Sequence, residues 1–336
     1  YYPRLEAVLP PAPDVDSLLA HHDYLRLDPE ARTIRILHGV HDVSTSVIVP
    51  PGFRLLVTAG TTLRFSGNAV LLSYGPIEFI GSKKSPVVLE PRQGARTWQG
   101  MVVMNAGLDS RLENVRIHRT KGISQGAWEL TGGVTFYHSS VSIKDVDFED
   151  NAGEDALNIV HSDFNIAGVR ILRTASDAFD SDFSQGKVGG SEFREIGLLG
   201  GGDAIDVSGT SITVHDTRFR NIGDKALSVG EKSRMIARKV SILGAGTAAA
   251  SKDGSLLEIS DSEIEAVRTA GLMAYIKKPE YGGPRIVAEN LHFEHNLHAA
   301  RAQKGSSIVI DGEAVQPEDI NVKAMYETIM KPGLRR

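Results

Sequence analysis

A short acidic motif recurs along the middle of the chain. Asp-Ala-Phe-Asp at 177–180 returns as Asp-Ala-Ile-Asp at 203–206, and weaker copies begin at residues 155 and 224. Successive copies start 22, 26 and 21 residues apart. A period of this length with variable insertions is typical of a solenoid, in which short stacked coils share one core.

The segments between the motifs have the pattern of short β-strands. Runs of three to five residues alternate between apolar and polar, and Gly, Asn and Asp interrupt them, whereas helical spacing is nearly absent between about residues 47 and 293. Examples are VSIKDVDF (141–148), FNIAGVRIL (164–172), SITVHDTRF (211–219) and SLLEISDSEI (255–264). The pattern predicts an all-β chain of short strands and tight turns.

Composition limits the classes of partner. The net charge is −5, with 24% charged and 41% hydrophobic residues, which excludes a disordered tail and a polybasic nucleic-acid binder. The absence of cysteine excludes disulfides and thiolate metal sites. No apolar run reaches the roughly 18 residues of a membrane span. Because the first residue is Tyr1 and not Met, we interpret the chain as a processed or trimmed product, from which an export signal could have been removed. We expect an extracytoplasmic location, either periplasmic, at the cell surface or secreted.

The coil length, the Trp98-Gln99-Gly100 sequence before a strand and the repeated Asp-Ala-apolar turn resemble the parallel β-helix of pectate lyases, polygalacturonases and mannuronan epimerases. The resemblance implies a right-handed parallel β-helix over residues 45–296, with an irregular N-terminal cap over 1–44 and a C-terminal tail over 297–336. Within the tail, Ile320, Val322, Met325 and Ile329 are near helical spacing, which predicts a capping helix within 318–330.

Strand alternation predicts which side chains of the motif face outward. In the third copy Ile205 and Val207 point into the core, so Asp206 points out. Neighbouring coils lie about 4.8 Å apart, which places Asp180 opposite Asp206 at roughly 5 Å and Asp182 about 7 Å along its strand. Stacking gives one outward column of Asn158, Asp180, Asp206 and Ser228, and a second of Val160, Asp182, Ser208 and Gly230.

Like charges directly opposite one another need compensation. Three kinds are open: a bound Ca²⁺ held by Asp180, Asp182 and Asp206, a shared proton with one raised pKa, or nearby lysines. Lys252 is expected about two coils, or roughly 10 Å, from Asp206. At that distance it could act as the base of a β-elimination or epimerisation, provided that its pKa is lowered.

The first aspartate of each motif has two interpretations. Asp155, Asp177, Asp203 and Asp224 stand where a strand begins, and four similar copies favour a repeated turn device in which the carboxylate accepts backbone N–H groups. The alternative is a catalytic role for Asp177 and Asp203. The full set of predicted catalytic residues is Asp177, Asp180, Asp203, Asp206 and Lys252, and the predicted substrate-binding residues are Asp182, Lys225, Tyr275, Lys277 and His161.

The resemblance extends in part to family motifs. Polygalacturonases carry Asn-Thr-Asp, Asp-Asp, Gly-His-Gly and Arg-x-Lys on successive coils; Asp177 and Asp203 match two of the acids, whereas Gly202 and Lys225 replace another acid and the histidine. The Tyr-Gly-Phe-Asp-Pro-His motif of mannuronan epimerases keeps Phe179 and Asp180, with Asp182 at the place of the histidine.

Two functions follow as hypotheses. The first is a secreted bacterial carbohydrate-active enzyme that acts on an extended, acidic polysaccharide by lyase, epimerase or hydrolase chemistry. The second is a non-catalytic β-helix module that binds polysaccharide or an envelope protein in an exopolysaccharide system. Gly202 and Lys225, which replace the residues of a hydrolase, favour the second.

Overall fold

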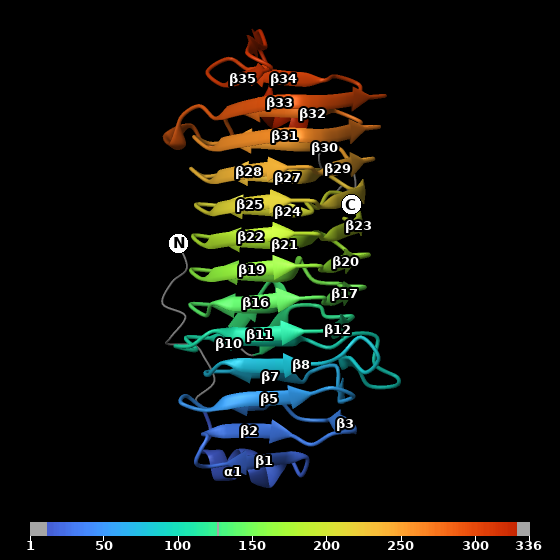
Figure 1. The fold of residues 1–336 in the computed structure, drawn as a ribbon, viewed down its shortest axis with the longest axis vertical. Coiled ribbons are helices and arrows are strands. Elements are labelled where there is room, and N and C mark those ends of the chain that lie inside the picture. The colour runs from blue at the N-terminus through green and yellow to red at the C-terminus, as the bar shows by residue number, and fades with distance from the viewer. Residues whose placement is uncertain (1–11, 126–127, 328–336) are drawn as a thin grey trace. The chain divides into compact units, whose positions relative to one another are not determined.

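The computed structural model describes residues 12–125 and 128–327, and the chain divides into two compact units, Tyr1–Ser162 and Asp163–Arg336. Within each unit, the equivalent strands of neighbouring coils lie one above another and run parallel (Figure 1). The predicted all-β parallel β-helix is therefore confirmed.

The first unit contains three stacks of parallel strands. Helix α1 (Val15–His21) begins the described part of the chain, and Asp14 caps it by accepting the Ser17 N–H at 2.8 Å. One stack consists of β2 (Thr33–Ile36), β5 (Arg54–Thr58), β8 (Ile77–Ile80), β11 (Ser110–Glu113) and β16 (Val141–Lys144). The second consists of β3 (Val40–Val43), β6 (Thr62–Phe65), β9 (Val87–Pro91), β12 (Val115–His118) and β17 (Asp147–Glu149). The third consists of β4 (Val47–Val49), β7 (Val70–Ser73), β10 (Gly100–Met104), β15 (Gly132–Tyr137) and β18 (Asp155–Val160). Strand β1 (Leu25–Asp28) pairs antiparallel with β2, and β13 (Ile123–Gln125) pairs antiparallel with β14 (Trp128–Leu130).

The second unit repeats this organisation. Its first stack contains β19 (Asp163–Ala167), β22 (Gln185–Gly189), β25 (Ser211–His215), β28 (Arg234–Arg238), β31 (Leu256–Glu265), β33 (Arg285–Glu294) and β35 (Ser307–Ile310). The second contains β20 (Arg170–Leu172), β23 (Glu192–Ile196), β26 (Arg218–Ile222) and β29 (Ser241–Leu243), which pairs with the long β31. The third contains β21 (Asp177–Asp182), β24 (Ile205–Ser208), β27 (Lys225–Gly230), β30 (Thr247–Lys252), β32 (Ala270–Tyr275), β34 (Ala300–Gln303) and β37 (Pro317–Glu318). The remaining elements are β36 (Glu313–Ala314), the 3-10 helix η2 (Pro279–Tyr281) and helix α2 (Val322–Met325).

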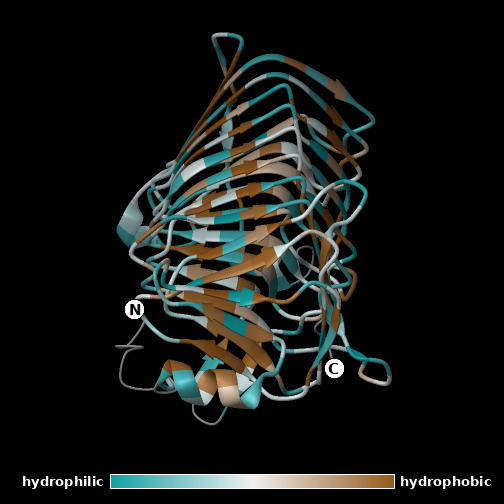
Figure 2. Cartoon of the chain, turned by 60° about the horizontal axis from the view of Figure 1, so that its bottom comes forward, coloured by the Kyte–Doolittle hydropathy of each residue, from teal (hydrophilic) through white to brown (hydrophobic). Residues whose placement is uncertain are grey.

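Alternation along the strands builds the core. Hydrophobic and hydrophilic residues band the strands along their length (Figure 2), and the inward positions, among them Phe179, Ile205 and Leu227, are almost wholly buried. In the first unit, Trp98 stacks on Phe65 with ring centroids 4.0 Å apart. The Trp98 indole N–H donates to the His118 carbonyl at 2.8 Å, which fixes the ring between coils.

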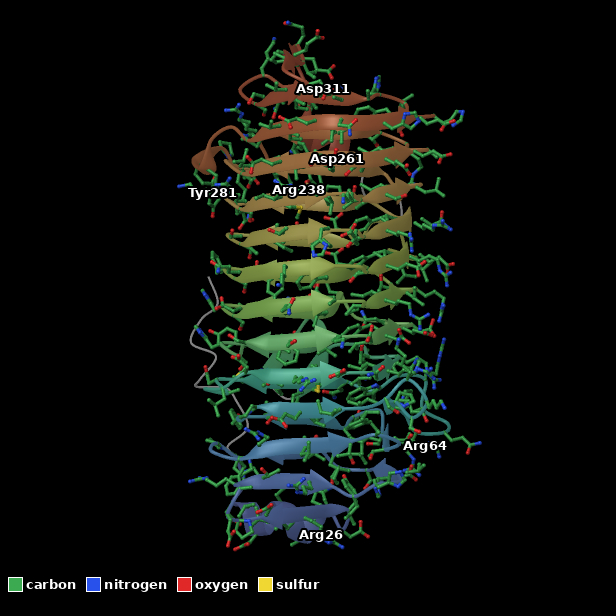
Figure 3. All side chains as sticks on the ribbon, in the orientation of Figure 1. Arg26, Arg64, Arg238, Asp261, Tyr281 and Asp311 are labelled. Atoms are coloured by element: carbon green, nitrogen blue, oxygen red, sulfur yellow. The ribbon has the colours of Figure 1, made fainter. Side chains whose placement is uncertain are left out.

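Short polar side chains join the turns of neighbouring coils. Asp261, Asn290 and Asp311 all have positive φ, between 49° and 52°, a region in which Asp and Asn are tolerated better than most residues. The Asn290 amide donates to Asp261 and the Asn290 backbone N–H donates to Asp311, each at 2.8 Å. Figure 3 labels the two aspartates, and the hydrogen bonds show that these turns are stacked in register.

The expected boundaries differ from the observed ones at both ends. Strands β1, β2 and β3 lie within residues 1–44, where we expected an irregular cap, and β2 and β3 already pair in parallel with the next coil. At the other end, β34, β35 and β37 continue the coils beyond residue 296. The described part of the predicted tail helix is only α2, and residues 328–330 lie outside the described residues. The part of the chain that the structure describes has no helix of a length and hydropathy suited to crossing a bilayer.

Candidate functional site

The acidic motifs lie on the outer face of the stack β21-β24-β27-β30-β32. Strand pairing places Asp180 opposite Asp206, Asp206 opposite Ser228, Ser228 opposite Ala250 and Ala250 opposite Met273. We call this row the first column. The predicted facing of Asp180 and Asp206 is confirmed. A second column contains Asp182, Ser208 and Gly230 in register, followed by the paired residues Lys252 and Tyr275.

Lys252 contacts Asp206 directly. The Lys252 ammonium lies 3.4 Å from an Asp206 oxygen, so the expected separation of roughly 10 Å is wrong. The expectation followed the backbone, whereas the long lysine side chain extends back across Gly230. A Cβ placed on Gly230 would lie 3.2 Å from Lys252 Cε, so the glycine leaves the room that the lysine occupies.

The ion pair favours the charged form of both partners. Burial by itself raises the pKa of Asp206, but the positive charges of Lys252 and Lys225 outweigh it and the pKa is lowered. For Lys252, burial lowers the pKa, but the Asp206 carboxylate outweighs it and the pKa is raised. A raised pKa disfavours the neutral amine that a general base requires. Lys252 therefore suits charge stabilisation, and its predicted role as a base rests on a condition that this geometry does not meet.

Lys225 forms a second, deeper charge cluster. Its side chain is only 3% exposed, and its ammonium lies 3.1 Å from an Asp203 oxygen and also contacts Asp224. Burial raises the pKa of Asp203 to about 6, since the opposing effect of Lys225 is incomplete and Asp224 adds a negative charge. The carboxylates of Asp203 and Asp224 hold the pKa of Lys225 well above its ordinary value in spite of burial. The predicted substrate-binding role of Lys225 would require a substrate to reach a nearly buried ammonium.

The leading aspartates connect one coil to the next. Asp177 accepts the backbone N–H of Asp203 at 2.8 Å, and Asp203 accepts the backbone N–H of Lys225 at 2.9 Å. These bonds support the interpretation as a repeated backbone device, although the acceptors reach the following coil and not their own turn. Catalytic roles for Asp177 and Asp203 stay predictions.

The C-terminal segment, residues 320–326, covers part of this face. Ile320 and Met325 pack with Ala250, Met273 and Tyr275, and Val322 and Tyr326 pack against the same cluster. Tyr275 is fully buried, so our placement of it on an open substrate-binding face is wrong for this structure. The hydroxyls of Tyr275 and Tyr326 hydrogen-bond at 2.8 Å, and burial raises the pKa of Tyr275.

Tyr326 also faces two of the lysines. The Lys277 ammonium lies 4.9 Å from the centroid of its ring, and the Lys225 ammonium lies 6.0 Å from it. Lys277 remains exposed, and its pKa is lowered by partial burial and by the positive charges of Lys252 and Lys225. Sequence reasoning missed Tyr326, and the neighbouring apolar stripe with Met325 was the only signal near it.

His161 belongs to the first unit, whereas the residues just described belong to the second. Its ring stacks on that of His138 with centroids 4.8 Å apart, and it meets Tyr137 edge-on. Its predicted binding role stays a prediction.

The predicted Ca²⁺ ligands are arranged differently from a compact metal site. Among the described residues, the group of three whose ligand atoms all lie within 4.8 Å of one another is Glu265, Glu294 and His295, all exposed. Asp180, Asp182 and Asp206 do not form such a group, and Lys252 already supplies a positive charge to Asp206. For Asp206 the structure shows a lysine contact, and the Ca²⁺ site stays a prediction.

No protein-family model and no curated protein matches the sequence. Solved structures with a similar fold include the catalytic domain of Agl-KA, at 10% identity and a TM-score of 0.51, with 82% of this chain and 62% of that one covered. The chain therefore spans less than two thirds of that domain. The periplasmic alginate epimerase AlgG matches at 10% identity and a TM-score of 0.50, with 88% and 82% covered. An alginate lyase from Paenibacillus sp. str. FPU-7 has a TM-score of 0.48 at 11% identity, with 78% and 98% covered. At such identities the first two show a shared fold.

Proposed function

We propose that the outer face of β21, β24, β27 and β30 binds an acidic polysaccharide and removes the C5 proton of a uronate, as a lyase or an epimerase does. The observation that carries the proposal is the Lys252–Asp206 ion pair on a face that also presents Lys277. The fold shared with an alginate epimerase supports it by analogy.

The lysines divide the chemistry between them. Lys252 is held as a cation by Asp206, so it suits neutralisation of the substrate carboxylate, which makes the neighbouring C5 proton easier to remove. Lys277 is exposed, and its lowered pKa makes its neutral form more accessible, so it is our choice for the base. The predicted base thus moves from Lys252 to Lys277.

Hydrolysis is the second candidate. Two carboxyl groups whose pKa values are pushed apart suit acid and base roles, and here the pKa of Asp203 is raised to about 6 while that of Asp206 is lowered. However, Asp203 is only 6% exposed and one of its oxygens contacts Lys225, which leaves little access for a glycosidic oxygen. Lys252 is similarly buried, at 7%, but the proposed base Lys277 is exposed, so proton abstraction fits the face better.

The test is a panel of uronate polymers with three readouts. Absorbance of unsaturated ends reports elimination, reducing sugar reports hydrolysis, and deuterium incorporated at C5 in D₂O reports epimerisation. Lys277→Met should lower the rate by about 10²-fold or more with polymer affinity nearly unchanged, because a general base is lost. Lys252→Met should weaken binding as well, because the cation is lost. Lys187→Met, on an exposed position of β22 in another stack, is the matched control.

Other outcomes separate the alternatives. Reducing sugar without unsaturated ends or deuterium would favour the hydrolase. Polymer binding with all three readouts flat would favour a non-catalytic binding module. The absence of both binding and turnover would contradict the proposed function.

The proposal also includes the location of the protein, a possible protein partner and a bound cation. We place the protein outside the cytoplasm, as the fold shared with a periplasmic epimerase suggests, and an envelope protein partner is part of the binding-module alternative.

Ca²⁺ at Asp180, Asp182 and Asp206 would add positive charge for a substrate carboxylate. In calorimetric titration with Ca²⁺, Lys252→Met should then bind more tightly than the parent, because a competing cation is removed; equal affinities would speak against this site.

A further inference from the structure

Within the second unit, the outer face of the third stack is partly exposed at β21 and β24 and covered from β27 onward. Along the first column, Asp180 and Asp206 are partly exposed, whereas Ser228, Ala250 and Met273 are fully buried although strand pairing puts them on the same face. The side chains that cover Ala250 and Met273 come from the C-terminal segment.

Polar contacts hold the C-terminal segment in place. The Tyr326 hydroxyl bonds that of Tyr275, and the Tyr326 ring lies under the Lys277 ammonium at 4.9 Å. The Gln303 amide donates to the Ile320 carbonyl at 3.3 Å, and the Asn321 side chain caps α2 by accepting the Ala324 N–H at 3.0 Å. The segment is thus attached to the coils at both of its ends.

The cover lies close to the charged residues. From β24, which carries Asp206, to β30, which carries Ala250, is two strand spacings, or about 10 Å. Tyr326 lies beside the lysines of this face, because its ring faces the ammonium groups of Lys277 and Lys225. A polymer lying along the columns would therefore meet the C-terminal segment within a few sugar rings of Asp206.

We propose that the C-terminal segment is a specificity element that stops the polysaccharide, so that the protein binds the end of a chain and not its interior. This inference rests on the proposed function, because it concerns the same face. The residues that set the stop are Met325, which packs on the sheet, and Tyr326, which borders the lysines.

Binding stoichiometry tests the proposal without depending on turnover. Uronate oligomers and polymers of defined lengths would be titrated into the protein and the number of protein molecules bound per polymer chain measured by sedimentation. For the parent, we expect about one protein per chain at every length, whereas interior binding gives a number that rises with length. Met325→Ala/Tyr326→Ala should change the first pattern into the second.

Tyr326→Phe is the matched variant. It keeps the ring that blocks the face and removes only the hydroxyl bonded to Tyr275, so it should still bind one per chain. If the double alanine variant has no cooperative thermal transition, it is left out. The binding stoichiometries of the parent and of Tyr326→Phe then test the proposal. A parent stoichiometry that rises with polymer length overturns the stop and leaves the proposed function intact, while absence of any polymer binding overturns both.

Discussion

Buried charges in the second unit occur in clusters whose members set one another's pKa. Asp203 keeps a raised pKa of about 6 because burial and Asp224 outweigh the ammonium of Lys225. The consequence is a definite pH dependence. Between the ordinary pKa of 3.8 and about 6, the folded protein holds a proton on Asp203 that the unfolded chain releases. This group therefore makes the free energy of unfolding fall as pH rises through that window.

Asp203→Asn removes the titration and keeps an oxygen acceptor for the Lys225 N–H. We compare the melting temperature of the parent with that of Asp203→Asn at each pH. We expect the parent's value minus the variant's value to be higher at pH 4 than at pH 7. Thermal unfolding of both proteins across this range measures it. A difference that is constant with pH would contradict the raised pKa.

Gly230 sets the position of Lys252. In Gly230→Ala the new Cβ would lie 3.2 Å from Lys252 Cε, so the lysine must move by a few tenths of an ångström, and we expect this to lengthen its contact with Asp206. We expect the pKa of Asp206 to rise, measured by NMR titration of its carboxyl carbon, because a neighbouring cation is withdrawn. Gly67→Ala, where the nearest atom lies at an ordinary 3.5 Å, is the control. An unchanged pKa of Asp206 in Gly230→Ala would show that the lysine adapts.

Alternation along a strand was enough to predict that Asp180 and Asp206 face each other, since pleating fixes which side chains leave the core. The same reasoning could not place the Lys252 ammonium, because strand register fixes Cα positions and leaves the end of a long side chain free. The burial of Tyr275 depends on a segment 51 residues later in the sequence, and no local pattern reports such packing.

At the scale of elements, strands form where alternation and turn residues agree, and the close packing of coils constrains the glycines between them. The expected boundaries missed β2, β3, β34 and β35 because they followed the regular strand pattern, which was recognised only between about residues 47 and 293. The Trp98-Gln99-Gly100 sequence, in contrast, was a sound indicator of a coil, since Trp98 is wholly buried.

Gly100 shows how close the coils approach. It has φ of +137°, and a Cβ there would lie 2.0 Å from the Gly133 carbonyl oxygen. Gly100→Ala should therefore lower the free energy of unfolding by more than the roughly 1–3 kcal/mol of backbone strain alone. Gly107→Ala is the control, because Gly107 has φ of +71° and a Cβ there would have no atom within 4 Å. Chemical denaturation compares them, and equal losses would show that the clash is relieved.

At the scale of the whole molecule, the net charge of −5 opposes the approach of a polyanion, while the cations of the candidate face are local. Long-range repulsion is screened when salt rises from about 0.01 to 0.15 M, because the Debye length falls from about 30 to about 8 Å. Contacts with Lys252 and Lys277 act at shorter range and are screened less. We expect the association rate constant of a polyuronate to increase over this range, measured by stopped-flow fluorescence, and that of a neutral polymer to stay constant. A rate constant that falls with salt would contradict this expectation and would show that attraction by the local cations outweighs the repulsion due to the net charge.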